Sequence, residues 1–317
     1  MNTLFFGTPE TAVPFLRLLA KRTQVLAVVS QPDRPAGRGL ETAATPVKSV
    51  ALELGLKVLQ PAKPSDIAAE LKDLGADLAV VVAYGRILKA DALAATRLGF
   101  MNAHFSLLPK YRGAAPVQWA LVRGEKKTGV SLFWLNEGMD TGPVQAMREI
   151  PIEPEQDAGE LLARLTALGV EMLDAELSAL EEGKVVKTPQ SGEPTLAPLI
   201  KREDARIDLG RPAHEVHDLV RGFRQWPRAY LEKAGVPRLL VLKTVLPKAA
   251  DPSPEGRPGR ILAVDRERGI LVQCGSSSRL WFLAVQPEGK KALNAADFAN
   301  GLRLAAGGFL PFADGTI

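Results

Sequence analysis

A run of six aliphatic residues, LAVVVA at positions 78–83, has the length of a β-strand and contains no polar side chain. Such a run is typical of a central strand buried on both faces, as in parallel sheets covered by helices. The first half of the chain repeats this pattern, because short apolar runs alternate there with amphipathic segments of helical length. This alternation predicts an α/β fold with an open, Rossmann-like, mostly parallel sheet and helices on both faces.

The first predicted helix has a recognisable start. Thr8, Pro9 and Glu10 supply a capping hydroxyl, a proline at the first helical position and an early acidic side chain. Across the first half we predict strands at residues 4–7, 25–30, 58–59, 78–83, 99–104 and 130–135, and helices at residues 47–54, 67–74, 89–94, 116–123 and 158–183.

The second part of the chain has a different pattern. The length of 317 residues favours two domains, and the turn formers TPQSGEP at 188–194 indicate a linker between them. A predicted helix at 213–223 is followed by short strands at 239–245, 260–264, 270–274 and 280–285. Strands of this spacing predict a small barrel or sandwich, and a five-stranded OB-type barrel would suit a nucleic-acid partner. We therefore expect a catalytic domain at 1–188, a linker at 189–207 and a small C-terminal β-barrel (OB-type) domain at 208–317.

Charge is unevenly divided between these parts. Residues 1–200 carry 21 Lys and Arg against 23 Asp and Glu, whereas residues 201–317 carry 19 against 13. The basic C-terminal third fits an RNA or DNA partner, although an ordinary solvated basic surface explains it equally well.

Localisation and redox chemistry are also constrained. The chain shows neither a long uncharged apolar run nor a secretory signal at its start, so we expect a cytoplasmic protein without a membrane span. The single Cys274 cannot form an internal disulfide, and its place in a strand-like run indicates packing.

Polar side chains stand at the end of the predicted strand 99–104. Asn102 and His104 are two residues apart and therefore share one face of the strand. Asp140 follows the next predicted strand, in the loop NEGMDTG at 136–142. Ligands of open α/β sheets bind outside the carboxyl ends of the strands, so we expect the loops after residues 83, 104 and 135 to form one site.

An amide, an imidazole and a carboxylate suit the transfer of an acyl group to an amine. Negative charge builds on the carbonyl oxygen during the attack, and the Asn102 amide and a protonated His104 are donors for that oxygen. The Asp140 carboxylate would favour the charged imidazole, orient it and accept the proton of the amine. A histidine at a strand end is more often a structural residue, so this local pattern leaves that alternative open.

Apolar residues in the neighbouring loops predict a slot for a flat heterocycle. Its walls would be formed by Ile87, Leu88, Leu107 and Leu108, while backbone amides and carbonyls would recognise the polar groups of the ligand. Other cofactor sites are disfavoured. His214 and His217 lack a cysteine cluster and indicate an ordinary helix rather than a zinc site, and the chain contains neither a Walker loop nor a GxGxxG fingerprint.

Longer motifs carry a family resemblance. The stretches NAHFSLLP at 102–109, YRGAAP at 111–116 and GMDTG at 138–142 resemble the 10-formyltetrahydrofolate-dependent formyltransferases. GTP at 7–9, QPDRPAGRG at 31–39 and VAYG at 82–85 match the same family, with Phe105 replacing its usual glycine. DARID at 204–208, WP at 226–227 and QPEGKKA at 286–292 are similar to the tRNA-formylating members, so the resemblance covers essentially the whole chain.

The resemblance implies a specific reaction and partner. A formyl group would pass from the co-substrate 10-formyltetrahydrofolate to the α-amine of methionine on charged initiator tRNA, for translation initiation, with no metal and in a monomer. It implies catalytic roles for Asn102, His104 and Asp140. The expected folate-site residues are Ser106, Leu107, Leu108 and Pro109, together with Tyr84, Gly85, Ile87 and Leu88; the expected tRNA contacts are Arg34, Arg38, Lys48, Lys290 and Lys291.

Two rival functions remain open from the sequence. The first is a folate enzyme whose formyl acceptor is water or a small amine, which the basic second domain argues against. The second is an RNA-binding protein without catalysis, which the intact Asn102, His104 and Asp140 argue against.

Overall fold

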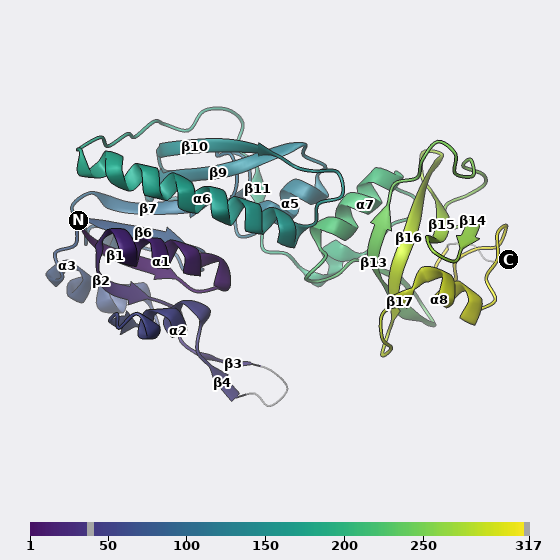
Figure 1. The fold of residues 1–317 in the computed structure, drawn as a ribbon, viewed down its shortest axis with the longest axis horizontal. Coiled ribbons are helices and arrows are strands. Elements are labelled where there is room, and N and C mark those ends of the chain that lie inside the picture. Colours follow the sequence, from purple (N-terminus) through teal and green to yellow (C-terminus); the bar gives the residue numbers. More distant parts are fainter. Residues whose placement is uncertain (37–40, 314–317) are drawn as a thin grey trace. The chain divides into compact units, whose positions relative to one another are not determined.

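The structure is a computed structural model that describes residues 1–36 and 41–313. The chain forms two compact units, which are described separately (Figure 1). Unit 1 comprises Met1–Pro116, Lys127–Pro151 and Leu162–Pro198, and unit 2 comprises Val117–Lys126, Ile152–Leu161 and Leu199–Ile317. Two short segments from the first half of the sequence therefore pack with the C-terminal part.

Unit 1 is built on a seven-stranded sheet with the strand order β10-β9-β7-β6-β1-β2-β5. The predicted α/β fold with a mostly parallel sheet is confirmed, and all residues of β6 are buried, as expected for a central strand. Five strands pair in parallel: β1 (Asn2–Gly7), β2 (Gln24–Val29), β5 (Val58–Leu59), β6 (Leu78–Val82) and β7 (Gly99–His104). β9 (Lys127–Trp134) is antiparallel to β7, and β10 (Val144–Pro151) is antiparallel to β9. The sequence pattern did not predict β10.

Helices cover both faces of this sheet, as predicted. On one face, Leu71 and Ala92 from two short helices pack in a core cluster with Leu4 and Phe6 of β1. Two longer helices, α1 and α6, lie on the opposite face (Figure 1). The helices of this unit are α1 (Val13–Arg22), α2 (Pro46–Glu53), α3 (Ala68–Asp73), α4 (Ala90–Leu93) and, from Leu162 on, α6 (Ala158–Glu181), whereas α5 (Pro116–Val122) belongs to unit 2 from Val117 on.

The predicted cap of the first helix is wrong. A short 3-10 turn (Glu10–Ala12) precedes α1, and neither segment has a side-chain cap. The Thr8 hydroxyl instead donates to the carbonyl oxygen of Tyr84 at 3.1 Å. This residue therefore joins the loop after β1 to the loop after β6.

Gly169 allows α6 to pack closely against α1. A Cβ at this position would lie 2.7 Å from Cζ of Phe15, which is fully buried in α1. Overpacking of this kind costs about 1–3 kcal/mol, so we expect Gly169→Val to lower the apparent Tm by roughly 3–10 °C. Thermal unfolding followed by circular dichroism measures the change. Ala167→Val, at an exposed position of the same helix, is the matched control, and an equal Tm for both variants would contradict this account.

The chain after α6 returns along the edge of unit 1. Thr188 and Val144 exchange backbone hydrogen bonds of 2.7 and 3.0 Å, so this segment borders β10. Further along, β11 (Leu196–Ala197) pairs in parallel with β8 (Arg112–Gly113). The turn formers at 188–194 therefore lie in a segment that is hydrogen-bonded to unit 1.

Unit 2 contains an antiparallel sheet with the strand order β12-β13-β16-β15-β14, to which β17 adds beside β16. The predicted small C-terminal barrel domain is confirmed. The sequence did not predict β12, β17 or α8. The elements are α7 (Ala213–Gly222), β12 (Tyr230–Lys233), β13 (Val236–Val245), β14 (Ile261–Asp265), β15 (Gly269–Cys274), β16 (Ser278–Pro287), β17 (Leu293–Asn294) and α8 (Ala295–Gly301).

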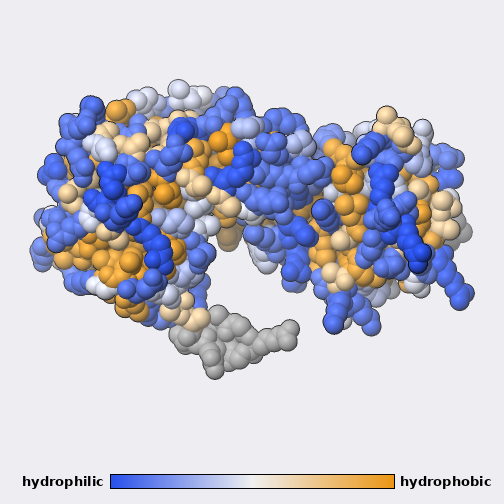
Figure 2. Space-filling model, in the orientation of Figure 1, coloured by the Kyte–Doolittle hydropathy of each residue, from blue (hydrophilic) through white to orange (hydrophobic). Residues whose placement is uncertain are grey.

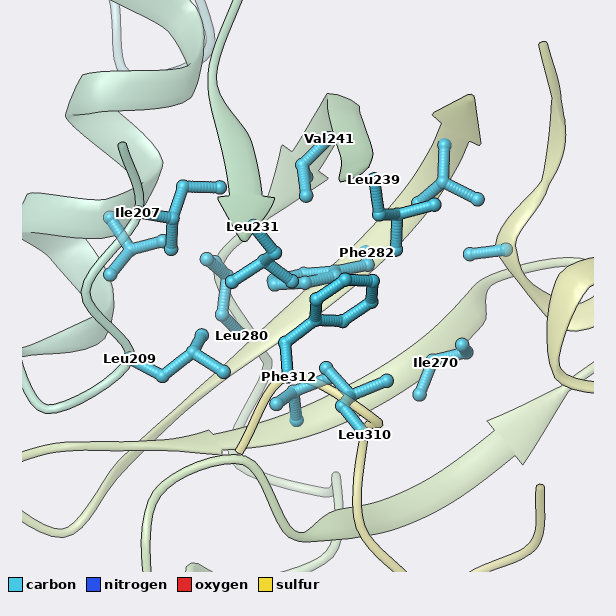
Figure 3. Close-up of a cluster of buried hydrophobic side chains, with 14 of the residues drawn as sticks. Ile207, Leu209, Leu231, Leu239, Val241, Ile270, Leu280, Phe282, Leu310 and Phe312 are labelled. Atoms are coloured by element: carbon cyan, nitrogen blue, oxygen red, sulfur yellow. The ribbon is translucent and has the colours of Figure 1, made fainter. Parts of the chain in front are cut away.

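The core of unit 2 lies between this sheet, α7 and α8. Phe282, Leu280 and Leu231 are among its buried side chains (Figure 3). Cys274 packs in the same cluster, as predicted, and burial raises the pKa of its thiol to about 12. Hydrophilic side chains are interspersed with apolar patches on the visible face of this unit (Figure 2). Within the described residues, no helix combines the length and hydrophobicity needed to span a bilayer.

Candidate active site

The end of β7 presents Asn102 and His104 on the same face. Asn102 pairs through its backbone with Val81 of β6 and Phe133 of β9, and it is half-buried. His104 is buried, and its ring meets Phe133 edge-to-face at 6.2 Å between centroids. The sheet therefore fixes the backbone of both residues.

Both nitrogens of the His104 ring face oxygen atoms. Nε2 lies 2.8 Å from the carbonyl oxygen of Tyr111. Because a carbonyl can only accept, Nε2 carries a proton and donates it there. Nδ1 faces Oδ2 of Asp140 at 3.7 Å. The ring is thereby oriented with one nitrogen toward a backbone group and the other toward a carboxylate.

Asp140 reaches His104 by a route that the sequence pattern did not predict. β9 runs antiparallel to β7, with Trp134 opposite Met101 and Ser131 opposite His104. The carboxyl end of β9 therefore lies beside the start of β7, and the expectation that it shares an edge with the parallel strands is wrong. The loop after β9 brings Asp140 back toward His104.

Backbone geometry fixes this loop. Asp140 has a φ of +53°, and its Oδ2 accepts the N–H of Gly113 at 2.7 Å. A Cβ on Gly142 would lie 1.7 Å from the carbonyl oxygen of Trp134, so only glycine fits there. Asn136 Oδ1 accepts hydrogen bonds from Gly138 N–H and the Thr141 hydroxyl. The carboxylate is thus held in place by its own loop and by the loop after β7.

The Ser-Leu-Leu-Pro segment forms a tightly bonded turn. The Ser106 hydroxyl donates to the carbonyl of Lys110 at 2.6 Å. Ser131 on β9 accepts the N–H of Leu108 and donates to the carbonyl of Ser106. Leu108 packs in a core cluster with Phe133, while Leu107 is half-buried and Pro109 is buried after a cis peptide bond. Phe105, which replaces the glycine usual in the family, packs its ring against that of Phe15, with 6.4 Å between the ring centroids.

The predicted slot residues from the loop after β6 separate into two groups. Tyr84 and Leu88 are buried in the core cluster of β1, where burial raises the pKa of the Tyr84 hydroxyl. Gly85 and Ile87 are exposed, and Ile87 leaves 78% of its surface accessible. The structure therefore does not gather all of the expected wall residues into one cluster.

The expected RNA-contacting residues differ in their surroundings. Lys48 Nζ pairs with Asp33 at 2.5 Å, and this hydrogen bond lowers the pKa of the Asp33 carboxyl. Arg34 donates to Gln31 Oε1 at 2.8 Å, whereas Arg38 lies outside the described residues. In unit 2, Lys290 and Lys291 are exposed in the turn between β16 and β17.

Comparison with known proteins identifies the family of this chain. Residues 1–177 match the family model described as formyl transferase, and residues 199–303 match the model of its C-terminal domain. The chain belongs to the formyl transferase family. The formyl transferases similar to it include a methionyl-tRNA formyltransferase of Sorangium cellulosum, 47% identical over 97% of this chain and 98% of the relative. Another, from Thermus thermophilus, is 44% identical over 97% of this chain and 98% of its own length.

Solved structures share the formyl transferase fold. An N-formyltransferase from Helicobacter canadensis, in complex with folinic acid and dTDP-3-aminofucose, gives a TM-score of 0.67 at 17% identity and covers 88% of this chain and 98% of that one. HypX from Aquifex aeolicus, in complex with tetrahydrofolic acid, gives 0.63 at 19% identity over 99% of this chain and 50% of that one. At these identities the likeness concerns the fold alone.

Sequence reasoning missed the backbone groups that hold His104 and Asp140. Tyr111 contributes only its carbonyl group to His104, and Gly113 only its N–H to Asp140. Backbone groups leave no mark in side-chain composition. Gly113 has a φ of +121°, and a Cβ there would lie 2.6 Å from the carbonyl oxygen of Ala197. The glycine itself was the only sign in the sequence that the backbone at this position is special.

Proposed function

We propose that this enzyme transfers the formyl group of 10-formyltetrahydrofolate to the α-amine of methionyl initiator tRNA, giving N-formylmethionyl-tRNA and tetrahydrofolate. The observation that carries this proposal is the identity of 41–47% over 96–98% of the chain to relatives named methionyl-tRNA formyltransferase. The Helicobacter canadensis N-formyltransferase, whose structure contains dTDP-3-aminofucose, is only 17% identical. With this role in translation initiation, we also propose a cytoplasmic enzyme.

The catalytic residues in this proposal are Asn102, His104 and Asp140. The amine attacks the formyl carbon, and the Asn102 amide and the Nδ1–H of a protonated His104 donate hydrogen bonds to the formyl oxygen as negative charge develops on it. The Tyr111 carbonyl and the Asp140 carboxylate hold the imidazole on its two sides, at 2.8 and 3.7 Å. The ring is oriented before the substrate arrives, so little reorganisation is needed during the reaction.

One proton must change place in this reaction. The attacking amine gains a C–N bond to the formyl group and loses a proton, while N10 of the folate loses the formyl group and gains a proton. Asp140 accepts the proton of the amine directly or through a water molecule. Its carboxylate is well suited to this step because its side chain keeps 15% of its surface accessible.

Folate binding is assigned to the loops after β6 and β7. Ile87 and Leu107 offer accessible apolar surface to a flat ring. Buried side chains support the backbone of these loops, namely those of Tyr84, Leu88, Ser106, Leu108 and Pro109. Gly85, with a φ of +76°, allows the turn beside Gln31. We assign residues 1–188 to catalysis and residues 208–317 to tRNA binding.

Lys290 and Lys291 are the proposed phosphate-binding residues of the second domain. We expect the Lys290→Ala/Lys291→Ala enzyme to show a KM for tRNA raised by about threefold to tenfold, because lysines on phosphates supply sequence-independent affinity. The slope of log KM against log salt should fall by roughly one unit for each phosphate that the variant no longer neutralises. The control is Lys72→Ala on α3, which is equally exposed. An unchanged salt slope in the double variant would refute the assignment.

A direct test compares classes of acceptor. Purified enzyme and 10-formyltetrahydrofolate are combined with charged initiator tRNA, with an amino-sugar nucleotide, or with no acceptor, and the release of tetrahydrofolate is followed. We expect rapid release only with the charged tRNA. Equal release without an acceptor would indicate a hydrolase, and release driven by the sugar nucleotide would indicate a small-molecule formyl transferase.

A further inference from the structure

The side-chain amide of Gln190 joins the two loops that flank His104 and Asp140. Its Nε2 donates to the carbonyl oxygens of Asp140 and Gly142, both at 2.8 Å. Its Oε1 accepts from Nε and Nη2 of Arg112, at 3.2 and 2.6 Å. A carbonyl only accepts and a guanidinium only donates, so the orientation of the amide is determined by its partners. Both hydrogens and the oxygen of the amide are engaged.

The donor end of Gln190 acts on a turn with unusual backbone geometry. Asp140 has a φ of +53°, in the left-handed region that a residue other than glycine adopts when its surroundings fix it. Gln190 binds the carbonyl of Asp140 itself and the carbonyl of Gly142, two residues further on. The amide therefore fixes the direction in which the Asp140 side chain projects.

The acceptor end of Gln190 acts on the loop that orients His104. Arg112 stands between Tyr111, whose carbonyl accepts from His104, and Gly113, whose N–H donates to Asp140. The same loop is fixed a second time, because Thr195 Oγ1 accepts the N–H of Tyr111 at 2.9 Å. Gln190 and Thr195 belong to one segment, so residues 190–195 hold both sides of the His104–Asp140 pair.

We propose that Gln190 is a positioning residue that holds Asp140 against Nδ1 of His104 by bridging Arg112 and the 140–142 turn. This inference rests on the proposed function of the site. Gln190 touches no reacting atom and acts through Asp140. In this role, the N–H donors of the Gln190 amide, rather than the volume of the side chain, determine kcat.

Gln190→Glu separates the two ends of the side chain. A glutamate has the same shape and keeps an oxygen for Arg112, but it loses both N–H donors and sets an oxygen against two carbonyls. We expect kcat to fall by about 10- to 100-fold in Gln190→Glu and Gln190→Ala, since small displacements of catalytic groups have effects of this size. Both KM values should stay within about threefold, because the substrates are bound elsewhere. The neighbouring, exposed Ser191→Ala serves as control and should match wild type.

A double-mutant cycle with Asp140→Asn distinguishes positioning from a general structural role. If Gln190 acts through Asp140, Gln190→Ala should lower kcat by less than about threefold in the Asp140→Asn background, although it lowers kcat at least tenfold in the wild-type background. Equal factors in both backgrounds would overturn the proposal. A kcat of Gln190→Glu within twofold of wild type would overturn it as well.

A readout without substrate keeps this test independent of the proposed function. The chain has three histidines, so the His104 ring signals can be assigned in NMR spectra by comparison with His104→Ala. We expect Gln190→Glu to shift the His104 signals in the same direction as Asp140→Asn and to leave His214 and His217 unmoved. Unshifted His104 signals would overturn the positioning role even in an active enzyme. Shifted signals in a protein that formylates no tRNA would support the positioning role and refute the proposed function alone.

Discussion

The His104→Ala enzyme is expected to transfer formyl groups with a kcat lowered by about 10²–10³-fold, the usual effect of removing one donor from an oxyanion site. The imidazole is buried, fixed by the Tyr111 carbonyl and directed at Asp140, and alanine provides no donor in its place. KM for the folate should change little, because the ring acts on charge that develops only in the transition state. Steady-state formylation of charged initiator tRNA measures both constants.

A second histidine provides the control for this substitution. His214 is exposed on α7 of unit 2, and His214→Ala should retain wild-type kcat. Thermal unfolding of both variants checks that the loss in His104→Ala is not a loss of folded protein. A kcat for folded His104→Ala within tenfold of wild type would contradict the assigned role.

Asp140→Asn is expected to lower kcat by about 10²–10⁴-fold, the range found when a general base is removed. Asparagine keeps an oxygen for the N–H of Gly113 and tolerates the positive φ of this position, so the loop should remain folded. It carries no charge to orient the imidazole and accepts no proton from the amine. The change therefore isolates the electrostatic and proton-accepting roles of the carboxylate.

The matched control is Asp73→Asn, at an exposed position of α3. Like Asp140→Asn, it removes one negative charge from unit 1, but at a position distant in sequence from Asp140. We expect this variant to match wild type in kcat and in both KM values. A similar loss of activity in Asp73→Asn would show that net charge, rather than Asp140 itself, controls the rate.

Much of the sheet was predictable because its signals are local. The aliphatic run of β6 and the short apolar run of β5 read directly as strands, and the structure places them at Leu78–Val82 and Val58–Leu59. Strand direction was not predictable for β9, because an apolar run looks the same whether its neighbours are parallel or antiparallel. β10 was missed because its outer residues, among them Arg148 and Glu149, are exposed and polar.

The candidate site shows the same division between local and long-range information. The spacing of Asn102 and His104 places them on one face of a strand, and their nearness to Asp140 was inferred from the loops. The hydrogen bonds of Gln190 span 48, 50 and 78 positions of sequence, so no local pattern contains them. The turn formers at 188–194 predict a linker from composition, whereas the pairing of β11, which follows them, with β8 forms only in the folded chain.

The product formed on tRNA is the most direct readout of the proposed reaction. Purified enzyme is supplied with 10-formyltetrahydrofolate and either initiator or elongator tRNA charged with methionine, and the amino acid released from the tRNA is identified by mass spectrometry. We expect N-formylmethionine from the initiator tRNA, at least about tenfold faster than from the elongator and dependent on His104 and Asp140. Unformylated methionine from the initiator tRNA, in the presence of active folate donor, would refute the proposed function.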